Sequence, residues 1–439
     1  MPTSGLSQLD RAYAHRYAGE GEDALRLALA IFEASNDELQ AAALISEVLT
    51  EEGRPEIAKE ALTRLVDASV RRGDMGGATV AICLAVDAGA EGNALRTSVA
   101  EVFARDSKRA RPDAHPTPPP LPTQVELSAE MKSLSGPGLL DRAEEGLRAW
   151  LATADPADAD APVPQLPLSS ALASATLGRL LEAATISDAA AGATIIDQGA
   201  EGKAAFLVVR GMAEAVRTAG ESEVRLAALG PGALFGEMAL VSDAPRAASV
   251  RALEPTRMLC FPRDTLEKLA KRDPSLGREL GSFCQARMVA NLMRHSGILA
   301  AVEVGEREEL MARFETRTFE AGERLVTHDE EAGGLFLLAS GTVAVSRVDE
   351  DGDHIHITDL GPGDVVGEIS LVLRRPATAD VTARHHTVAL ELSRDQFQQA
   401  IKKYPTLLGE LYELATTRDE ETRSVVAQEA LDVEDVVLL

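Results

Sequence analysis

The fold of this chain can be worked out from two runs that lie four residues apart, Phe235-Gly236-Glu237-Met238-Ala239-Leu240 and Pro245-Arg246-Ala247-Ala248-Ser249-Val250. Gly236 lets the backbone approach a ligand closely, and the apolar segment behind it can form a helical turn whose free N–H groups face an anion. Pro245 fixes the direction in which Arg246 leaves its turn, and the guanidinium offers donors that match phosphate oxygens. These two runs predict a phosphate-binding loop.

Glu237 refines this prediction, because a carboxylate beside a phosphate is repulsive unless it accepts a hydrogen bond from another part of the ligand. A sugar hydroxyl is such a donor, so the ligand expected from the residues alone is a ribose phosphate. The alternative is a surface turn whose arginine points into solvent. Short glycine-punctuated runs upstream, such as Thr194-Ile195-Ile196 and residues 206–209, favour a folded β domain around the loop.

The two runs resemble the phosphate-binding cassette of the cyclic-nucleotide-binding domain family, found in regulatory subunits of cAMP-dependent protein kinase and in catabolite activator proteins. The resemblance implies that Glu237 takes the ribose 2′-hydroxyl and Arg246 the cyclic phosphate. It also implies that the cassette is lined by Gly236, Met238, Ala239, Ala247 and Ser249. Family members that prefer cGMP usually place a threonine directly after the arginine. Since Ala247 stands there, the resemblance favours cAMP over cGMP.

A second copy of the same pattern follows. Gly236-Glu237 reappears as Gly367-Glu368, and the glycines at 192 and 211, nineteen residues apart, correspond to glycines at 322 and 341. A period of 130 to 131 residues predicts two whole domains in tandem, at residues 168–296 and 297–418. The resemblance therefore implies two β-roll, jelly-roll-like domains with flanking helices.

The second cassette lacks the phosphate arginine, because Pro376-Ala377-Thr378 stands where the first has Pro245-Arg246-Ala247. Removing a paired cation from a desolvated anion costs about 2–5 kcal/mol, which is about thirtyfold to several thousandfold in affinity. A non-binding or altered second site is expected, although a neighbouring arginine could reach back. The candidate residues of this second site are Gly367, Glu368, Ser370, Arg375 and Thr378.

The N-terminal part predicts an all-α array over residues 1–107, since apolar residues recur at helical spacing. The pattern from Gly19 to Ala24 recurs from Gly53 to Ala58, a step of 34 residues that resembles tetratricopeptide repeats; an unrelated helical bundle is the alternative. Residues 108–124 are proline-rich and 152–167 are rich in Ala, Asp and Pro, so both predict linkers, with a helical segment at 125–151 between them and an acidic tail at 419–439.

Composition limits the classes of function. Asp and Glu number 70 against 44 Lys and Arg, for a formal charge of −26, which disfavours nucleic acid and anionic membrane as partners. The three cysteines lie in apolar sequence, and no export signal or membrane span is evident, so the cytoplasm is expected. The histidines lack other ligands at metal spacing, and no P-loop or nucleophile elbow occurs, so no enzyme, metal or cofactor is expected.

The sequence thus predicts a cytosolic receptor for a cyclic nucleotide whose N-terminal array binds a protein partner, and a homodimer is compatible with this arrangement. Two alternatives stay open. One is a regulatory, inhibitory subunit of a protein kinase, although the first linker offers only Lys108-Arg109-Ala110-Arg111-Pro112 in place of an Arg-Arg-x-Ala or Arg-Arg-x-Ser substrate mimic. The other is a structural scaffold with vacant nucleotide sites.

Overall fold

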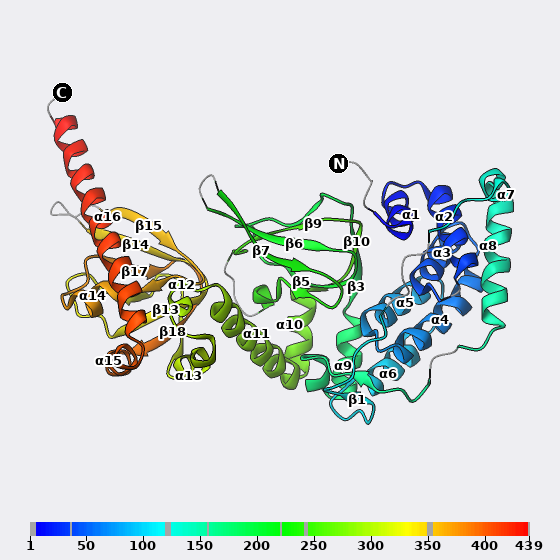
Figure 1. The fold of residues 1–439 in the computed structure, drawn as a ribbon, viewed down its shortest axis with the longest axis horizontal. Coiled ribbons are helices and arrows are strands. Elements are labelled where there is room, and N and C mark those ends of the chain that lie inside the picture. The colour runs from blue at the N-terminus through cyan, green and yellow to red at the C-terminus, as the bar shows by residue number, and fades with distance from the viewer. Residues whose placement is uncertain are drawn as a thin grey trace. The chain divides into compact units, whose positions relative to one another are not determined.

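A computed structural model describes residues 6–35, 37–118, 124–155, 158–219, 222–240, 245–348 and 354–437 (Figure 1). The chain divides into two compact units: Met1–Leu240 with Ala248–Phe283, and Val241–Ala247 with Cys284–Leu439. No helix within the described ranges is long and apolar enough to span a membrane. The predicted fold class, an all-α N-terminal region followed by two β domains with flanking helices, is confirmed.

The N-terminal region consists of consecutive helices, each in contact with the next: α1 (Gln8–Tyr17), α2 (Gly21–Ala34), α3 (Leu39–Glu51), α4 (Pro55–Arg71), α5 (Met75–Asp87) and α6 (Gly92–Phe103). The short α7 (Ala129–Ser133) precedes α8 (Gly136–Leu151), which packs on α2, α3 and α4. Glycines with positive φ end α1, α3, α4 and α5, which is why short turns suffice between helices. The helical array is confirmed, and its likeness to tetratricopeptide repeats stays a prediction.

The two segments expected to be linkers are in contact with each other. β1 (Ala110–Arg111) pairs in parallel with β2 (Val163–Pro164), and the Thr117 amide donates to the carbonyl of Arg72 over 2.8 Å. Residues 119–123 and 156–157 of these segments lie outside the described residues. Proline-rich sequence favours extended backbone, and extended backbone can also pair as a β-strand. The described parts of these segments therefore pair with each other, and Thr117 contacts the helical region.

The first β domain is a sandwich of two four-stranded antiparallel sheets. One sheet has the order β3-β10-β5-β8 and the other β4-β9-β6-β7. The strands are β3 (Thr185–Ala189), β4 (Thr194–Ile196), β5 (Ala204–Arg210), β6 (Ala213–Ala219), β7 (Ser222–Leu229), β8 (Leu234–Phe235), β9 (Ser249–Ala252) and β10 (Thr256–Pro262). Helix α9 (Ser174–Glu182) precedes the sandwich, and α10 (Arg263–Arg272) and α11 (Pro274–His295) follow it. Buried residues of β10, α10 and α11 join one hydrophobic cluster with the helical region.

The second β domain repeats this topology, with sheets β11-β18-β13-β16 and β12-β17-β14-β15. Its strands are β11 (Glu315–Phe319), β12 (Arg324–Val326), β13 (Gly334–Ser340), β14 (Val343–Val348), β15 (His354–Leu360), β16 (Val365–Val366), β17 (Asp380–Ala383) and β18 (Thr387–Ser393). Its helices are α12 (Gly297–Ala300), α13 (Arg307–Met311), α14 (Glu368–Leu373), α15 (Arg394–Lys403) and α16 (Pro405–Val437). The expected boundary at residue 418 falls inside α16, which continues through the segment expected as a tail.

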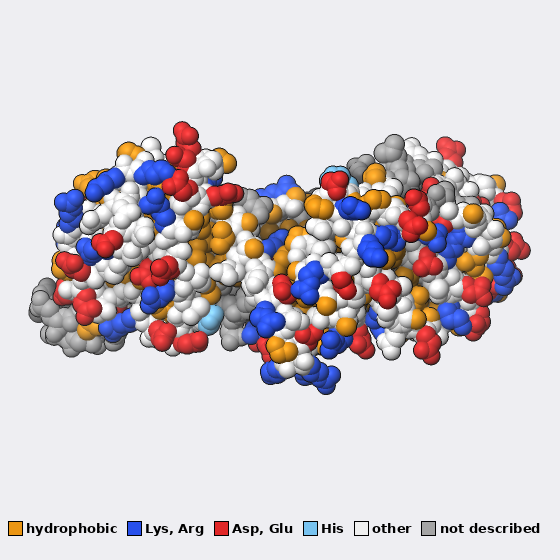
Figure 2. All heavy atoms as spheres, turned by 90° about the horizontal axis from the view of Figure 1, so that it is seen from below, with side chains coloured by type: hydrophobic (Ala, Val, Ile, Leu, Met, Phe, Trp, Pro, Cys, Tyr) orange, Lys and Arg blue, Asp and Glu red, His pale blue; other side chains and the backbone are white. Residues whose placement is uncertain are grey.

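The two β domains share the same close contact between a glycine and a threonine backbone. A Cβ on Gly211 would lie 2.7 Å from the Cα of Thr256, and a Cβ on Gly341 would lie 2.7 Å from the Cα of Thr387. Both glycines have positive φ, of 83° and 91°. The glycine spacing seen in the sequence therefore marks the same close approach of two backbones in each domain. On the face that Figure 2 shows, acidic and basic side chains are interspersed despite the net charge of −26.

Candidate functional site

The first cassette begins where β8 ends. Gly236 has a φ of 72°, in the left-handed region that favours glycine, and it turns the chain into a short 3-10 helix, Glu237–Leu240. Phe235, directly before it, stacks on Phe206 of β5 with the ring centroids 5.4 Å apart, which anchors the turn to the sheet. The two residues before Glu237, a glycine in the left-handed region and a phenylalanine stacked on β5, therefore fix the position of Glu237.

Glu237 is the buried carboxylate of this cassette, with only 4 % of its surface exposed. Met238 beside it is half-buried, and the side chain of Ala239 lies outside the described residues. A carboxylate at this depth needs a donor. Gly236, Glu237 and Met238 thus follow one another at the start of one helical turn, and their role in binding a nucleotide stays a prediction.

Arg246 and Ala247 lie directly before β9, where Arg246 is half-buried and Ala247 is exposed. The residues between the 3-10 helix and Pro245 lie outside the described ranges. Ser249 begins β9, and its hydroxyl accepts a hydrogen bond of 2.9 Å from the Gln198 amide. That hydroxyl therefore closes a neighbouring turn of its own domain. The joint use of Glu237 and Arg246 for one ligand stays a prediction.

The second cassette repeats the glycine turn. Gly367 has a φ of 86°, and a Cβ on it would lie 2.5 Å from the carbonyl oxygen of Gly334. Glu368 follows at the start of α14 and is 3 % exposed. Burial raises the pKa of the Glu368 carboxyl, and the nearby Arg418 guanidinium opposes that rise. Glu368 thus lies as Glu237 does, buried and directly after a glycine with positive φ.

The partner of Glu368 comes from the C-terminal helix. Arg418 of α16 donates to Glu368 Oε1 over 3.1 Å and to the carbonyl oxygen of Val365 over 2.5 Å. The next residue, Asp419, forms an ion pair with Arg375. Both charged residues predicted for the second site are therefore engaged by two consecutive residues of α16.

The remaining predicted residues of the second site serve the fold. The Ser370 hydroxyl accepts a hydrogen bond of 3.0 Å from the Ala332 amide, and Thr378 is half-buried. Ala377, which replaces the phosphate arginine, is 6 % exposed, and its amide donates to the carbonyl of Glu330 over 2.9 Å. In return, the Asp329 amide donates to the carbonyl of Ala377 over 3.0 Å. This backbone pairing fixes the segment where the first cassette carries Arg246.

Arg418 and Asp419 are functional candidates that the sequence interpretation missed. The signal was present, because Leu407, Leu411 and Ala415 are buried at helical spacing and the same stripe continues to Arg418 and Asp419. The expected domain end at 418 separated these two residues, and the acidic composition after it suggested a solvated tail.

Residues 187–273 and 316–404 match the family model described as cyclic nucleotide-binding domain. The chain contains two cyclic nucleotide-binding domains. These two domains are homologous to those of cAMP-dependent protein kinase regulatory subunits. With the bounds expected from the sequence, we call them domain 1 (residues 168–296) and domain 2 (residues 297–418). The matched residues begin at 187, so the family model says nothing of the helical region.

Two relatives are each 30 % identical to the chain. The regulatory subunit of cAMP-dependent protein kinase from Yarrowia lipolytica matches over 210 residues, which is 48 % of this chain and 52 % of the relative. The type II regulatory subunit from Drosophila melanogaster matches over 176 residues, 40 % of this chain and 43 % of the relative. The chain spans about half the length of the curated relatives it matches. The solved regulatory domain of Toxoplasma gondii PKA with cAMP is 22 % identical, covering 58 % of this chain and 92 % of that chain, with a TM-score of 0.27.

Proposed function

We propose that this protein is a cyclic-nucleotide receptor that binds cAMP in domain 1 and changes its contacts with a protein partner as a result. Glu237 takes the ribose 2′-hydroxyl and Arg246 the cyclic phosphate, with Gly236, Met238, Ala239, Ala247 and Ser249 around them. The proposal includes no catalytic step and no metal, and it places the protein in the cytoplasm. A homodimer is compatible with it.

The observation that carries the proposal is the buried Glu237 carboxylate, which directly follows a left-handed glycine inside a domain that matches the cyclic nucleotide-binding model. A ribose hydroxyl is the kind of neutral donor that a buried carboxylate can use. The chain also retains Arg246 in this cassette, whereas the second copy has Ala377. Domain 1 therefore keeps both the anion partner and the hydroxyl partner that the nucleotide needs.

For domain 2 we infer a different state, in which α16 takes the place of a nucleotide. Glu368 and Arg375, the charged residues of its cassette, are engaged by Arg418 and Asp419. A nucleotide would have to displace a buried ion pair and would find no arginine at residue 377. One cAMP molecule per chain is expected.

The helical region is the proposed output of the receptor. It shares a hydrophobic cluster with β10, α10 and α11 of domain 1, including Leu259, Phe261 and Leu276. A ligand that binds one arrangement of these helices better than another shifts their populations, with no chemistry required. Because the helical region packs on the same elements, such a shift changes the surface that it presents to a partner.

Titration calorimetry with cAMP and cGMP on the full chain tests the proposal. Wild type is expected to bind about one cAMP and to prefer it over cGMP, and Arg246→Ala is expected to weaken binding by about thirtyfold to several thousandfold. Arg225→Ala is the matched control, since Arg225 lies in the same domain in an exposed ion pair with Glu214 and should change little. Absence of any heat or thermal shift with millimolar nucleotide would support the vacant scaffold instead.

The kinase regulatory subunit is the second candidate, favoured by the homology of both domains to such subunits. In this chain, the basic segment that precedes domain 1 is not free: Ala110 and Arg111 form β1, and Arg109 Nε donates to the carbonyl of Ala161 over 3.0 Å. Affinity capture with a purified kinase catalytic subunit, with and without cAMP, separates the candidates. Nucleotide-sensitive binding of the kinase would favour the regulatory subunit over the adaptor.

A further inference from the structure

A cavity of about 340 Å³ lies in the helical region, outside both cyclic nucleotide-binding domains. It is bounded by the C-terminal ends of α4 and α8 and by the segment that joins α2 to α3. The side chains that matter are Arg64, Arg72, Asp155, Trp150, Leu39 and Ala68. None of these residues belongs to the elements that form the nucleotide cassettes.

Arg64 is held rigidly at the wall of this cavity. Its guanidinium lies over the indole of Trp150, 4.3 Å from the ring centroid, and donates to the Trp150 carbonyl over 2.5 Å and to Thr153 Oγ1 over 3.2 Å. Trp150 is itself buried and packs edge-on against Phe32 with the centroids 5.8 Å apart. A guanidinium fixed in this way is already ordered before a ligand arrives, which lowers the entropy cost of binding.

The cavity wall carries two guanidiniums, Arg64 and Arg72, and two carboxylates, Asp37 and Asp155, and Arg71, which does not line the cavity, adds a third guanidinium next to Asp155. Arg72 donates to the carbonyl of Ala68 over 3.1 Å and to Asp37 over 2.9 Å, and Asp155 lies 3.7 Å from Arg72 and 3.4 Å from Arg71. Within the described part of the chain, Arg64 has no carboxylate at ion-pair distance. Burial lowers the pKa of Arg64; the charge of Asp155 opposes this shift, and the charges of Arg71 and Arg72 add to it. The two carboxylates therefore pair with Arg71 and Arg72, and among the described residues Arg64 has none.

Apolar carbon lies beside these cations. Leu39 and Ala68 line the cavity, and Thr153 and Ala154 are exposed at its rim. A glutamate side chain matches this combination, since its carboxylate pairs with a guanidinium while its methylenes contact apolar surface. From this combination of fixed guanidiniums and apolar wall we propose that the cavity binds acidic side chains of a peptide segment in a protein partner. The inference builds on the proposed role of the helical region as the partner surface.

The net charge of −26 does not prevent such binding. At physiological ionic strength the Debye length is about 8 Å, so distant acidic residues are screened while partly buried arginines act on a ligand at contact. The affinity should fall as salt rises, because the recognition is electrostatic.

Trp150 supplies the readout, because it is the single tryptophan of the chain and lies at this cavity. The full chain is titrated with an acetylated, amidated tetraglutamate peptide, and the tryptophan emission is followed. A tetraglutamine peptide serves as the neutral control. Tetraglutamate is expected to shift the emission saturably, and tetraglutamine is expected to leave it unchanged.

Variants localise the site. Arg72→Gln keeps the stacking of Arg64 on Trp150 and should weaken tetraglutamate binding at least tenfold, the effect of about 1.4 kcal/mol. Arg142→Gln is the control, because Arg142 is an exposed arginine of α8 that pairs with Glu33. Circular dichroism and the unfolding midpoint show that each variant is folded.

Three results would overturn the assignment. They are an equal response to tetraglutamine, unchanged tetraglutamate affinity in folded Arg72→Gln, and full competition by inorganic phosphate at matched ionic strength, which would indicate a site for small free anions. Calorimetry with cAMP on the same samples reports separately on domain 1. A negative result in the tetraglutamate titration therefore does not affect the test of cAMP binding by domain 1, and a negative result with cAMP does not affect the test of the cavity.

Discussion

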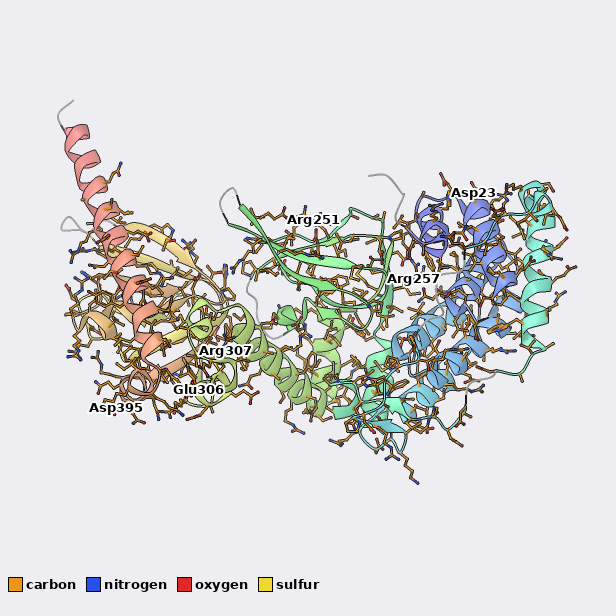
Figure 3. The ribbon with its side chains drawn as sticks, viewed as in Figure 1. Asp23, Arg251, Arg257, Glu306, Arg307 and Asp395 are labelled. Atoms are coloured by element: carbon orange, nitrogen blue, oxygen red, sulfur yellow. The ribbon has the colours of Figure 1, made fainter. Side chains whose placement is uncertain are left out.

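Arg257 of β10 and Glu47 of α3 form a buried ion pair that joins domain 1 to the helical region. The guanidinium donates to the two Glu47 oxygens over 2.9 and 3.2 Å, and to the two Asp188 oxygens over 2.8 and 2.7 Å. Arg257, which Figure 3 labels, lies between the strands of domain 1 and the helical region, and 2 % of its surface is exposed. Tyr17 adds a hydrogen bond of 3.0 Å from its hydroxyl to Asp188. The helical region is therefore held to domain 1 by specific polar contacts as well as by a shared apolar cluster.

Replacing Arg257 by methionine should destabilise the unit formed by the helical region and domain 1 by about 1.5–3 kcal/mol, because the half-buried Glu47 and the exposed Asp188 lose the cation that they share, while Arg16 still pairs with Glu47. Urea unfolding of the full chain measures the effect. Arg317→Met is the matched control, since Arg317 forms an exposed ion pair with Glu391 and should cost no more than about 1 kcal/mol. Equal effects of the two substitutions would contradict a structural role for the Arg257 cluster.

Glu38 makes the stability of the same unit depend on pH. Burial raises the pKa of its carboxyl from 4.5 to about 7, and the charge of Arg210 opposes the rise. Because the folded protein prefers the protonated form, the stabilisation from Glu38 is complete below pH 4.5 and is lost as pH rises to about 7. The total is at most about 3 kcal/mol.

Glu38→Gln should therefore flatten the fall in unfolding midpoint between pH 5 and pH 8, with the largest difference from wild type at pH 8, where the variant is the more stable. Thermal melts of both proteins across this range measure the difference. Glu33→Gln, at an exposed carboxylate, is the control and should follow wild type. Parallel pH profiles for wild type and Glu38→Gln would show that this carboxyl does not titrate in the range.

Gly367→Ala tests the glycine turn of the second cassette. The substitution places a Cβ 2.5 Å from a backbone oxygen and forces alanine to a φ of 86°, which alone costs about 1–2 kcal/mol. Domain 2 should lose at least that much stability in chemical unfolding. Gly361→Ala is the control, because a Cβ there has nothing within 4 Å and the φ is not positive. If both variants unfold like wild type, the turn tolerates a side chain.

Local signals in the sequence predicted the fold well. Gly211 and Gly341 have positive φ where two backbones approach closely, and their spacing predicted two domains in tandem, while the family resemblance supplied the expected β fold. The same holds for Gly236 and Glu237, whose placement depends on one strand end and one turn.

Contacts between distant segments could not be predicted in this way. Arg418 lies 50 residues from Glu368, and their pairing depends on how α16 packs against α14. The pairing of Arg257 with Glu47 likewise has no local signal in the sequence, because the two residues lie 210 positions apart. The composition of the first linker indicated extended backbone but not that β1 would pair with β2.

Arg418→Met gives the most direct test of the closed second cassette. It leaves the 3 % exposed Glu368 without a cation, so domain 2 should lose about 3–5 kcal/mol of stability, and the pKa of Glu368 should rise further above its usual range. Binding of cAMP to domain 2 should not appear, because Ala377 still stands where a phosphate arginine is needed. Calorimetry in an Arg246→Ala background isolates domain 2, and Arg423→Met, at an exposed arginine one turn further along α16, is the control. Tight cAMP binding by the double variant would mean that Arg418 alone keeps a competent site closed.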